Sequence, residues 1–481
     1  MCNIDQSTTI PHECPLELLE SELQRDILLE ATTPIQILNL IKASPRFHQV
    51  FLLNKEFILS TIARRQLHPA VFPEALTFAT MSQFEQPCSR ITAMMFCEIN
   101  PSNSHDWQKA VTTIPESIAL CKFTSNLKFF VEDYARNTLP IMAGLGKSTN
   151  ISVESEYWPE RPVSYSELSE TEIGRLQRAF CRFEIYRHLF AQCSANLDHS
   201  IRKCASQPAV RPAEQASLYL GKFPDYQVAE IDCIRDYLIR RLRGICTELE
   251  NEAVATLSHE RFVFDREGDA ETDQWSSGVF LFTKDGKQAQ EGHLEHLMSL
   301  GLPYIRRIFE STGDERRALF VRDIGSCLIQ RINPWSFLTK ALDCLGRNPA
   351  WENLLLPSEA ESPCVLEATS DMELDIPAAW PWANPRRPPV MLHNHNSKGL
   401  RDWGYVFWDF DRLDRSGILE RESNDVLVNK FDELGASRSP SVQERLLKPL
   451  SIWYLGADWE SPEEEEWEDW SEEMYSRQPD N

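Results

Sequence analysis

The sequence has far fewer basic residues than acidic ones. Lys and Arg number 49 against 73 Asp and Glu, which gives a formal net charge of −24 over 481 residues. Nucleic-acid binding depends on a basic surface that neutralises phosphates, so this balance argues against a nucleic-acid partner. It argues equally against anionic membrane surfaces, which attract polybasic segments.

Long hydrophobic runs are also missing. The longest nearly apolar stretches, such as residues 91–97, fall far short of the roughly 20 residues that a membrane-spanning helix needs. The N-terminal region carries neither a basic nor an apolar signal segment, so we expect no secretory signal. The 13 cysteines are scattered without any C-x-x-C, as is typical of free thiols in a reducing compartment. We therefore expect a cytoplasmic or nuclear protein that is not secreted and has no membrane partner.

Complete catalytic and cofactor motifs are missing as well. Residues 146–148 read like the end of a Walker A loop, but Ile141 stands where that motif begins with glycine. The acidic run 265–276 has Ala and Ser where an EF-hand needs Gly and Glu. His293 and His296 lack the glutamate and third ligand of a zinc protease, so we predict surface histidines. We predict no cofactor, no metal site and no enzymatic activity, with an enzyme of unrecognised type as the third hypothesis.

What is present is a punctuated apolar stretch at residues 15–66. It is divided by Thr33-Pro34 and Ser44-Pro45, and a Ser or Thr before Pro combines an N-cap with a first-turn residue. Proline also disfavours helical geometry in the residue before it, so each pair ends one helix and begins the next. Three short helices bury too little surface to be stable alone. The remaining chain or another protein must therefore cover them.

The three predicted helices differ in their apolar residues. The middle one is apolar nearly all round, which is unusual for a surface helix. The first puts Leu16, Leu19, Leu23 and Ile27 on one face, the second carries Ile37, Leu38, Leu40 and Ile41, and the third carries Phe47, Phe51, Ile58 and Ile62.

This stretch resembles an F-box, the adaptor-binding module of Skp–cullin–RING ubiquitin ligases, and more narrowly a fungal family of F-box-like proteins. The matching pieces are Glu22-Leu23, Ile27-Leu28 and the runs 37–41 and 43–47. The sequence departs from the family at Leu19-Glu20, where Leu-Pro is usual, and at Phe47, where Trp is usual. The resemblance implies an adaptor-binding set of Leu19, Leu23, Ile27, Leu28, Ile37, Leu38, Ile41, Pro45 and Phe47.

The body of the chain reads as helical. We predict a helix over 127–139 that ends before Pro140, and a helix after Ser169 that begins with a capping box to Glu172. Narrow apolar stripes follow along 173–190 and 231–249, so both helices should pack as parts of one core. The stretches 168–190, 231–250 and 403–409 also resemble the fungal family.

Charged and aromatic side chains mark two further places in the body. Arg240, Arg241 and Arg243 form a local basic face, which we interpret as a solvated face paired with nearby Glu rather than a partner site. The aromatic run 403–408 would be buried on both sides if extended, and we interpret it as core packing that holds the C-terminal part on the helices rather than a ligand platform.

The predicted fold class is mainly α, with an N-terminal three-helix F-box-like unit on a large irregular helical domain with minor β content at 258–292. The predicted divisions are a disordered N-terminus (1–14), the F-box-like unit (15–66), a helical body (67–356), a proline-rich strap or linker (357–396), an aromatic block packed on the body (397–456) and an acidic disordered tail (457–481). The tail reads as a solubilising or self-masking segment, or alternatively as one that docks into a basic groove.

Three functions are compatible with these features. In the first, the protein is a non-catalytic substrate receptor whose F-box-like unit docks on a Skp-type adaptor and whose body presents a protein client to the ligase. In the second, it is an interaction or scaffold protein whose F-box-like helices are packed into its own core. The third is the enzyme of unrecognised type. Exposure of residues 15–47 separates the first two, because an exposed apolar patch of several hundred Å² marks a docking surface.

Overall fold

The computed structural model describes ten segments of the chain. They are residues 14–31, 34–84, 88–98, 113–146, 167–191, 210–259, 286–321, 337–345, 376–384 and 397–420. These segments are helical and contain no strand, so the prediction of a mainly α fold is confirmed. The β-like pieces expected at 258–292 fall largely outside the described residues. So do the predicted N-terminal segment before Cys14, most of the strap, residues 421–456 of the aromatic block, and the acidic tail.

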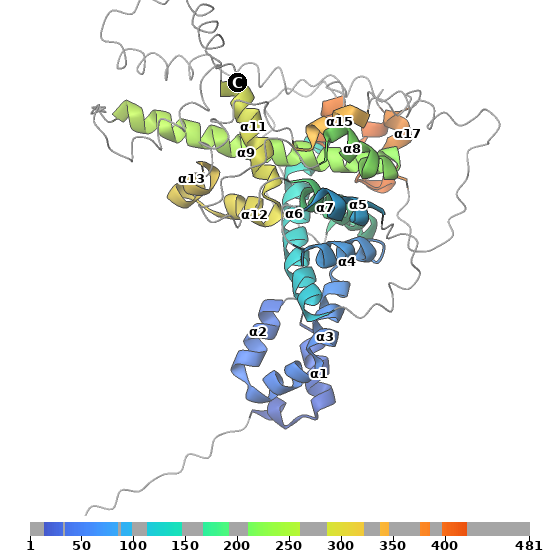
Figure 1. The fold of residues 1–481 in the computed structure, drawn as a ribbon, viewed down its shortest axis with the longest axis vertical. Coiled ribbons are helices and arrows are strands. Elements are labelled where there is room, and N and C mark those ends of the chain that lie inside the picture. Colours follow the sequence, from blue (N-terminus) through green and yellow to red (C-terminus); the bar gives the residue numbers. More distant parts are fainter. Residues whose placement is uncertain are drawn as a thin grey trace, which may run out of the picture.

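The helices form a body with a smaller group of helices at one end (Figure 1). In chain order they are η1 (Pro15–Leu18), α1 (Ser21–Leu29), α2 (Pro34–Ala43), α3 (Pro45–Arg65), α4 (Phe72–Met81), α5 (Arg90–Glu98), α6 (Ile114–Gly146), α7 (Glu170–Phe190), α8 (Pro212–Leu218), η5 (Leu220–Lys222), α9 (Asp225–His259), α11 (Gly286–Ser299), α12 (Leu302–Glu310), α13 (Gly313–Val321), α15 (Thr339–Leu345), α17 (Ala379–Ala383), α18 (Lys398–Asp402), α19 (Phe410–Ser416) and η8 (Ile418–Glu420). We call residues 14–65, with η1 and α1 to α3, the N-terminal unit.

The N-terminal unit contains the three helices that its two prolines predict. The Ser44 side chain accepts a hydrogen bond from the Phe47 N–H at 3.4 Å, so the predicted cap of α3 is confirmed. Thr33 lies outside the described residues. The predicted face of the first helix is wrong, because Leu16 belongs to the separate turn η1 and the buried residues of α1 are Gln24 and Leu28.

Helix α3 joins the N-terminal unit to the body. It packs against α1 and α2, and it also packs against the long helix α6 (Figure 1). The Cys121 thiol on α6 donates to the Leu59 carbonyl at 3.6 Å. Midway along α3, Asn54 leaves helical geometry (φ −124°, ψ 16°) and its side chain donates to the Val50 carbonyl at 2.9 Å.

Helix α6 is longer than predicted, and it does not end before Pro140. It begins 13 residues before the expected start at residue 127 and continues through the proline to Gly146. An internal proline removes one backbone hydrogen bond and usually kinks or ends a helix. Here Leu127, Phe130 and Tyr134 are fully buried along the same helix, so tertiary packing outweighs that local cost.

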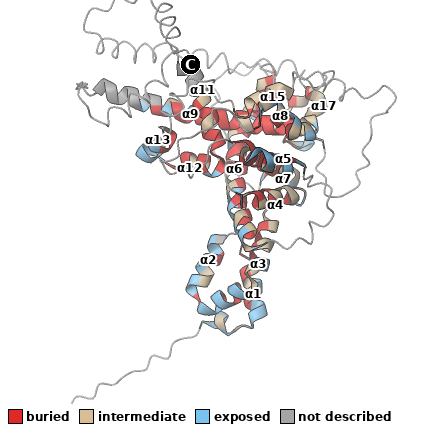
Figure 2. Cartoon of the chain, viewed as in Figure 1, coloured by how far each residue is buried: buried red, intermediate tan, exposed pale blue. Residues whose placement is uncertain are grey.

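Helix α7 crosses the centre of the body and is buried almost all round (Figure 2). Its predicted capping box is confirmed, with the Ser169 hydroxyl and the Glu172 N–H 3.1 Å apart and the Glu172 carboxylate accepting from the Ser169 N–H at 3.1 Å. The narrow stripe predicted for it is wrong. Arg178 and Glu184 are buried as well, because each forms an ion pair inside the core.

The aromatic run after α18 is not extended. Residues 403–407 form a series of turns in which Gly404 has φ +68°, and the Trp408 indole donates to the Trp403 carbonyl at 2.7 Å. Both tryptophans are fully buried, and Trp380 of α17 stacks on Tyr405 with the ring centroids 6.2 Å apart. The run packs against α6, where the ring centre of Tyr134 lies 5.1 Å from that of Phe407 and 6.3 Å from that of Trp408.

Two predictions about charged side chains have opposite outcomes. His293 is not a surface histidine, since it is 1% exposed with Nε2 2.7 Å from the Phe320 carbonyl oxygen. The three arginines of α9 are paired within the chain, as predicted, but they are half-buried rather than on a solvated face, and two of their partners are aspartates: Arg240 pairs with Asp402, Arg241 with Asp133 and Arg243 with Glu291. Across the described helices, none is long and apolar enough to cross a membrane.

Candidate docking surface

Three of the predicted adaptor-binding residues lie in the interior of the N-terminal unit. Leu28 of α1, Ile37 of α2 and Phe47 of α3 are each 3% exposed or less. These side chains belong to the hydrophobic core that holds the three helices together. A partner could touch them only by opening the unit, so we assign them to its stability.

The other six predicted residues reach the surface of the unit. Leu23 and Leu38 are 49% and 44% exposed, and Pro45 is also exposed. Leu19, Ile27 and Ile41 are half-buried, and Ile27 and Ile41 pack against the core. The structure therefore divides the predicted set into core residues, half-buried residues and three that are open to solvent.

Four of the exposed residues of α2 form a stripe along one face of the helix. Ile35, Leu38, Asn39 and Lys42 follow at spacings of three, one and three residues, and all four are exposed. Residues three and four apart lie on one face of a helix. Ile37 on the opposite face is buried. We call Ile35, Leu38, Asn39 and Lys42 the α2 outer stripe. Because Ile35 and Leu38 of this stripe are exposed while Ile37 packs in the core, the helix carries apolar side chains on both faces.

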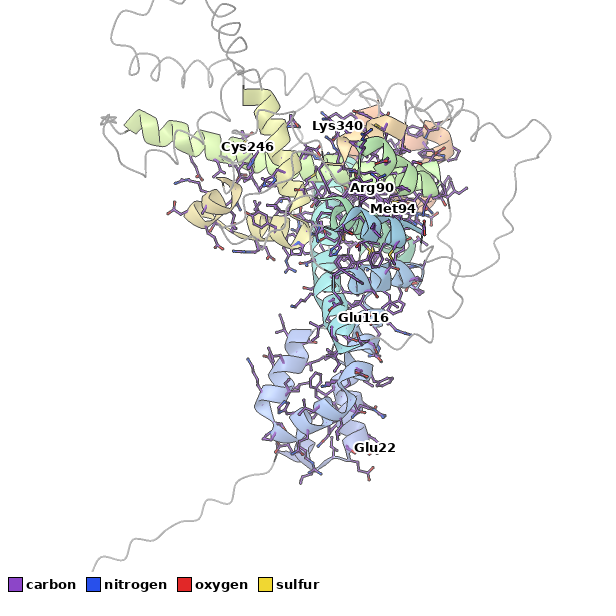
Figure 3. The ribbon with its side chains drawn as sticks, in the orientation of Figure 1. Glu22, Arg90, Met94, Glu116, Cys246 and Lys340 are labelled. Carbon is purple, nitrogen blue, oxygen red and sulfur yellow. The ribbon has the colours of Figure 1, made fainter. Side chains whose placement is uncertain are left out.

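A second exposed apolar face lies on η1 and α1. Leu16, Leu18 and Leu23 are 46%, 61% and 49% exposed. We call these three leucines the α1 face. Acidic side chains surround them, with Glu20, Glu22 and Asp26 all exposed, and Figure 3 shows Glu22 at the end of the unit farthest from the body. Both faces therefore carry large apolar side chains, but the α1 face is acidic and the α2 outer stripe carries a cation.

Polar contacts hold η1 in place so that its leucines stay at the surface. The fully buried Gln24 side chain donates to the Leu16 and Glu17 carbonyl oxygens, each at 3.2 Å. Glu17 is also held from α3, because its carboxylate accepts from the Ser44 hydroxyl and its carbonyl from the Arg46 guanidinium. The turn is thus tied to both neighbouring helices.

The junction between the N-terminal unit and the body is also held by polar contacts. Gln177 of α7 is buried, and its side chain accepts from the His68 N–H at 2.8 Å and donates to the Gln66 carbonyl at 2.8 Å. Nearby, the Arg64 guanidinium lies 4.5 Å from the centre of the Phe72 ring. These contacts fix the end of α3 to the body and therefore set the direction in which the unit projects.

Sequence reasoning missed several exposed apolar residues of this unit. Leu18 and Ile35 lie outside the predicted adaptor-binding set, and so do Leu52, Leu53 and Phe57 of α3, which are 51%, 84% and 55% exposed. For Ile35 a signal was present, since it stands three residues before Leu38 on the same helical face. For the α3 residues the kink at Asn54 turns the helix, and sequence periodicity does not reveal such a turn.

The described part of the chain contains no cluster of three or more His, Cys, Asp or Glu side chains that could hold a metal ion. The exposed apolar side chains of the N-terminal unit make up the candidate docking surface. Comparison with protein-family models, with curated proteins and with solved structures found no match to this chain.

Proposed function

We propose that this protein is a non-catalytic receptor subunit that docks through its N-terminal unit on a Skp-type adaptor of a cullin–RING ubiquitin ligase. The observation that carries the proposal is the exposure of Leu23 and Leu38, which belong to the adaptor-binding set that the F-box resemblance implies. Exposed groups of large apolar residues on a folded unit are characteristic of interaction surfaces. The body, which α3 and α6 connect to this unit, is the part that would present a protein client.

The arrangement of the unit supports docking over internal packing. In the scaffold hypothesis the F-box-like helices are covered by the rest of the chain. In the structure α1 and α2 pack mainly against α3, and the unit extends from one end of the body (Figures 1 and 2). Its outward apolar side chains thus remain accessible to a second protein.

The proposal is tested by co-purification of the full chain with a purified Skp-type adaptor. Leu23→Glu combined with Leu38→Glu places a charge at the centre of each exposed face. Burial of one leucine is worth about 1.5–3 kcal/mol, so each substitution should weaken binding about tenfold or more. The double variant should therefore lose the adaptor.

Ile91→Glu is the matched control for these substitutions. Ile91 is an apolar residue that is 73% exposed, but it lies on α5 in the body. This variant should retain the adaptor at the wild-type level. Failure of the wild-type chain to retain the adaptor, or unchanged retention by the double variant, would contradict the proposal.

A further inference from the structure

The α2 outer stripe combines apolar and basic character in an unusual way for this acidic chain. Ile35 is 69% exposed and Leu38 is 44% exposed, and Lys42 follows one turn later on the same face. Among the described residues no carboxylate lies within ion-pair distance of Lys42. The exposed apolar group on α5 differs from the stripe, because Arg90 beside it is already paired with Glu214 at 2.8 Å.

The sequence contains one segment with the complementary character. Residues 458–475 hold ten acidic and no basic residues, together with Trp459, Trp467 and Trp470. Trp467 and Trp470 are three residues apart, as are Ile35 and Leu38, and carboxylates surround them on both sides. A segment of this kind offers aromatic anchors for the apolar part of the stripe and negative charge for Lys42.

We propose that the acidic segment 458–475 binds the α2 outer stripe of the same chain. The described residues end at Glu420, and the 37 residues 421–457 lie between it and the segment. At about 3.3 Å per residue, such a connection reaches up to roughly 125 Å when extended. The α1 face is less suited to the segment, because Glu20 and Glu22 beside it are exposed carboxylates and the neighbouring cation, Arg25, is already paired with Asp26 at 3.2 Å. Charge thus favours the α2 stripe.

This contact would compete with the adaptor. The contact itself can exist whether or not the protein binds an adaptor. Only its role as a competitor of the adaptor rests on the proposed function. A tethered segment acts at an effective concentration on the order of 1 mM. If its intrinsic dissociation constant is about 0.1 mM, adaptor binding by the full chain is weakened roughly tenfold relative to a chain whose segment cannot bind.

The contact is tested on the full chain with a carbodiimide, which joins a carboxylate and an amine that are already in contact. Mass spectrometry should find Lys42 linked to acidic residues of 458–475 in preference to Lys55 and Lys340, with a yield independent of protein concentration. Trp467→Ser with Trp470→Ser should reduce that yield at least fivefold, and so should Leu38→Ser. Ile91→Ser on α5 should leave it unchanged.

Three outcomes would overturn the proposal. The first is equal cross-linking of all lysines to the segment. The second is a Lys42 cross-linking yield that rises with protein concentration, which would indicate contact with a second copy of the chain. The third is a Lys42 yield that is unchanged by replacement of both tryptophans. The adaptor titration is a separate arm, in which the tryptophan double variant should bind about tenfold more tightly than the wild type. If neither the wild type nor the variant binds the adaptor, that result contradicts the proposed function. The Lys42 cross-link still tests whether the segment contacts the α2 outer stripe.

Discussion

At the scale of single residues, the body is held by buried ions that pair with one another. The Arg401 Nε lies 2.6 Å from an Asp236 carboxylate oxygen and 3.3 Å from one of Asp232, and all three residues are almost fully buried. Arg178 and Glu230 form a second buried pair. Such pairs add little net stability over apolar packing, but losing one partner is costly because the other charge stays buried.

Arg401→Met should therefore destabilise the protein strongly. The substitution leaves the carboxylates of Asp232 and Asp236 without their shared guanidinium, and such losses cost about 3–5 kcal/mol. Denaturant unfolding of the full chain measures this cost. Arg317→Ala is the control, since the Arg317–Asp314 pair is exposed and such pairs contribute at most about 1 kcal/mol. Equal effects of the two substitutions would contradict this account of the buried cluster.

The cost of Arg401→Met should also depend on pH. Burial raises the pKa of Asp236, but the guanidinium groups of Arg401 and Arg235 outweigh it and hold that pKa well below its usual range. A carboxyl with a lowered folded-state pKa contributes stability above its unfolded pKa of about 4, and this contribution is lost as pH falls below it. The two unfolded chains titrate alike, so the difference between wild type and variant should decrease in acid once the buried carboxyls of the variant, which lack Arg401, take up protons. Denaturant unfolding should therefore show a larger difference at pH 7 than at about pH 4.

His293 should make the protein less stable in mild acid. Burial, together with the nearby His296, lowers the pKa of His293 to about 3. The unfolded chain, with an ordinary histidine pKa of about 6.5, takes up the proton first, so stability falls as pH decreases from 6.5 toward 3. Between pH 7.5 and 5.5 the wild type should lose about 1.4 kcal/mol more than His293→Gln. Equal losses in denaturant titrations at the two pH values would show that His293 is not the cause.

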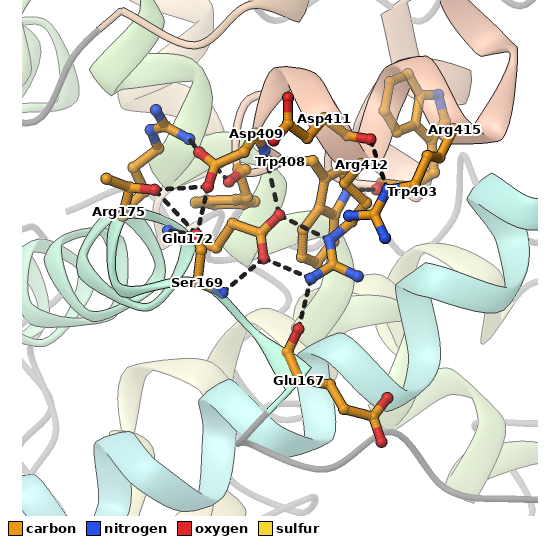
Figure 4. Close-up of polar contacts among 12 residues, drawn as sticks. Glu167, Ser169, Glu172, Arg175, Trp403, Trp408, Asp409, Asp411, Arg412 and Arg415 are labelled. Carbon is orange, nitrogen blue, oxygen red and sulfur yellow. Dashed lines mark hydrogen bonds and ion pairs between the residues drawn. The ribbon is translucent and has the colours of Figure 1, made fainter.

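At the scale of elements, the C-terminal segment 397–420 completes the N-terminus of α7 (Figure 4). The Arg412 guanidinium donates to both carboxylate oxygens of Glu172 at 2.7 Å. The Asp409 carboxylate accepts from Thr171 at 2.6 Å and from Arg175 at 2.8 Å. Residues more than 230 positions apart thus share one polar cluster, and the capping box of α7 belongs to it.

A double-mutant cycle measures this coupling. Arg412→Gln and Glu172→Gln each remove one half of the pair, so their effects on the free energy of unfolding should be non-additive by about 1–3 kcal/mol. Additive effects would mean that the C-terminal segment and the capping box of α7 act independently.

Local signals in the sequence predicted helix starts better than helix surroundings. The caps at Ser44 and Ser169 could be predicted because they depend on neighbouring residues alone. The length of α6 and the burial of α7 could not, because they depend on partners that are distant in sequence. An arginine such as Arg178 is expected to face solvent, but in the structure it is buried because it pairs with Glu230. For the same reason the nine residues of the candidate site could be predicted only as one adaptor-binding set, while its division into core and surface residues required the structure.

At the scale of the whole molecule, the N-terminal unit has a core and a surface whose substitutions should behave differently. Leu28 is fully buried, so Leu28→Ala should lower the free energy of unfolding by about 2–5 kcal/mol. Leu23→Glu and Leu38→Glu change exposed side chains and should alter it by about 0.5 kcal/mol each. Thermal denaturation of the three variants checks this, and large destabilisation by the exposed substitutions would favour the scaffold hypothesis.

The central claim is that the exposed faces of the N-terminal unit bind a Skp-type adaptor. Its most direct test is hydrogen exchange of the full chain with and without saturating adaptor. The account predicts slower exchange in peptides covering residues 16–27 and 35–47, with unchanged exchange in α7 and α9 at the centre of the body. Unchanged exchange throughout the N-terminal unit, or protection confined to the body, would contradict the claim.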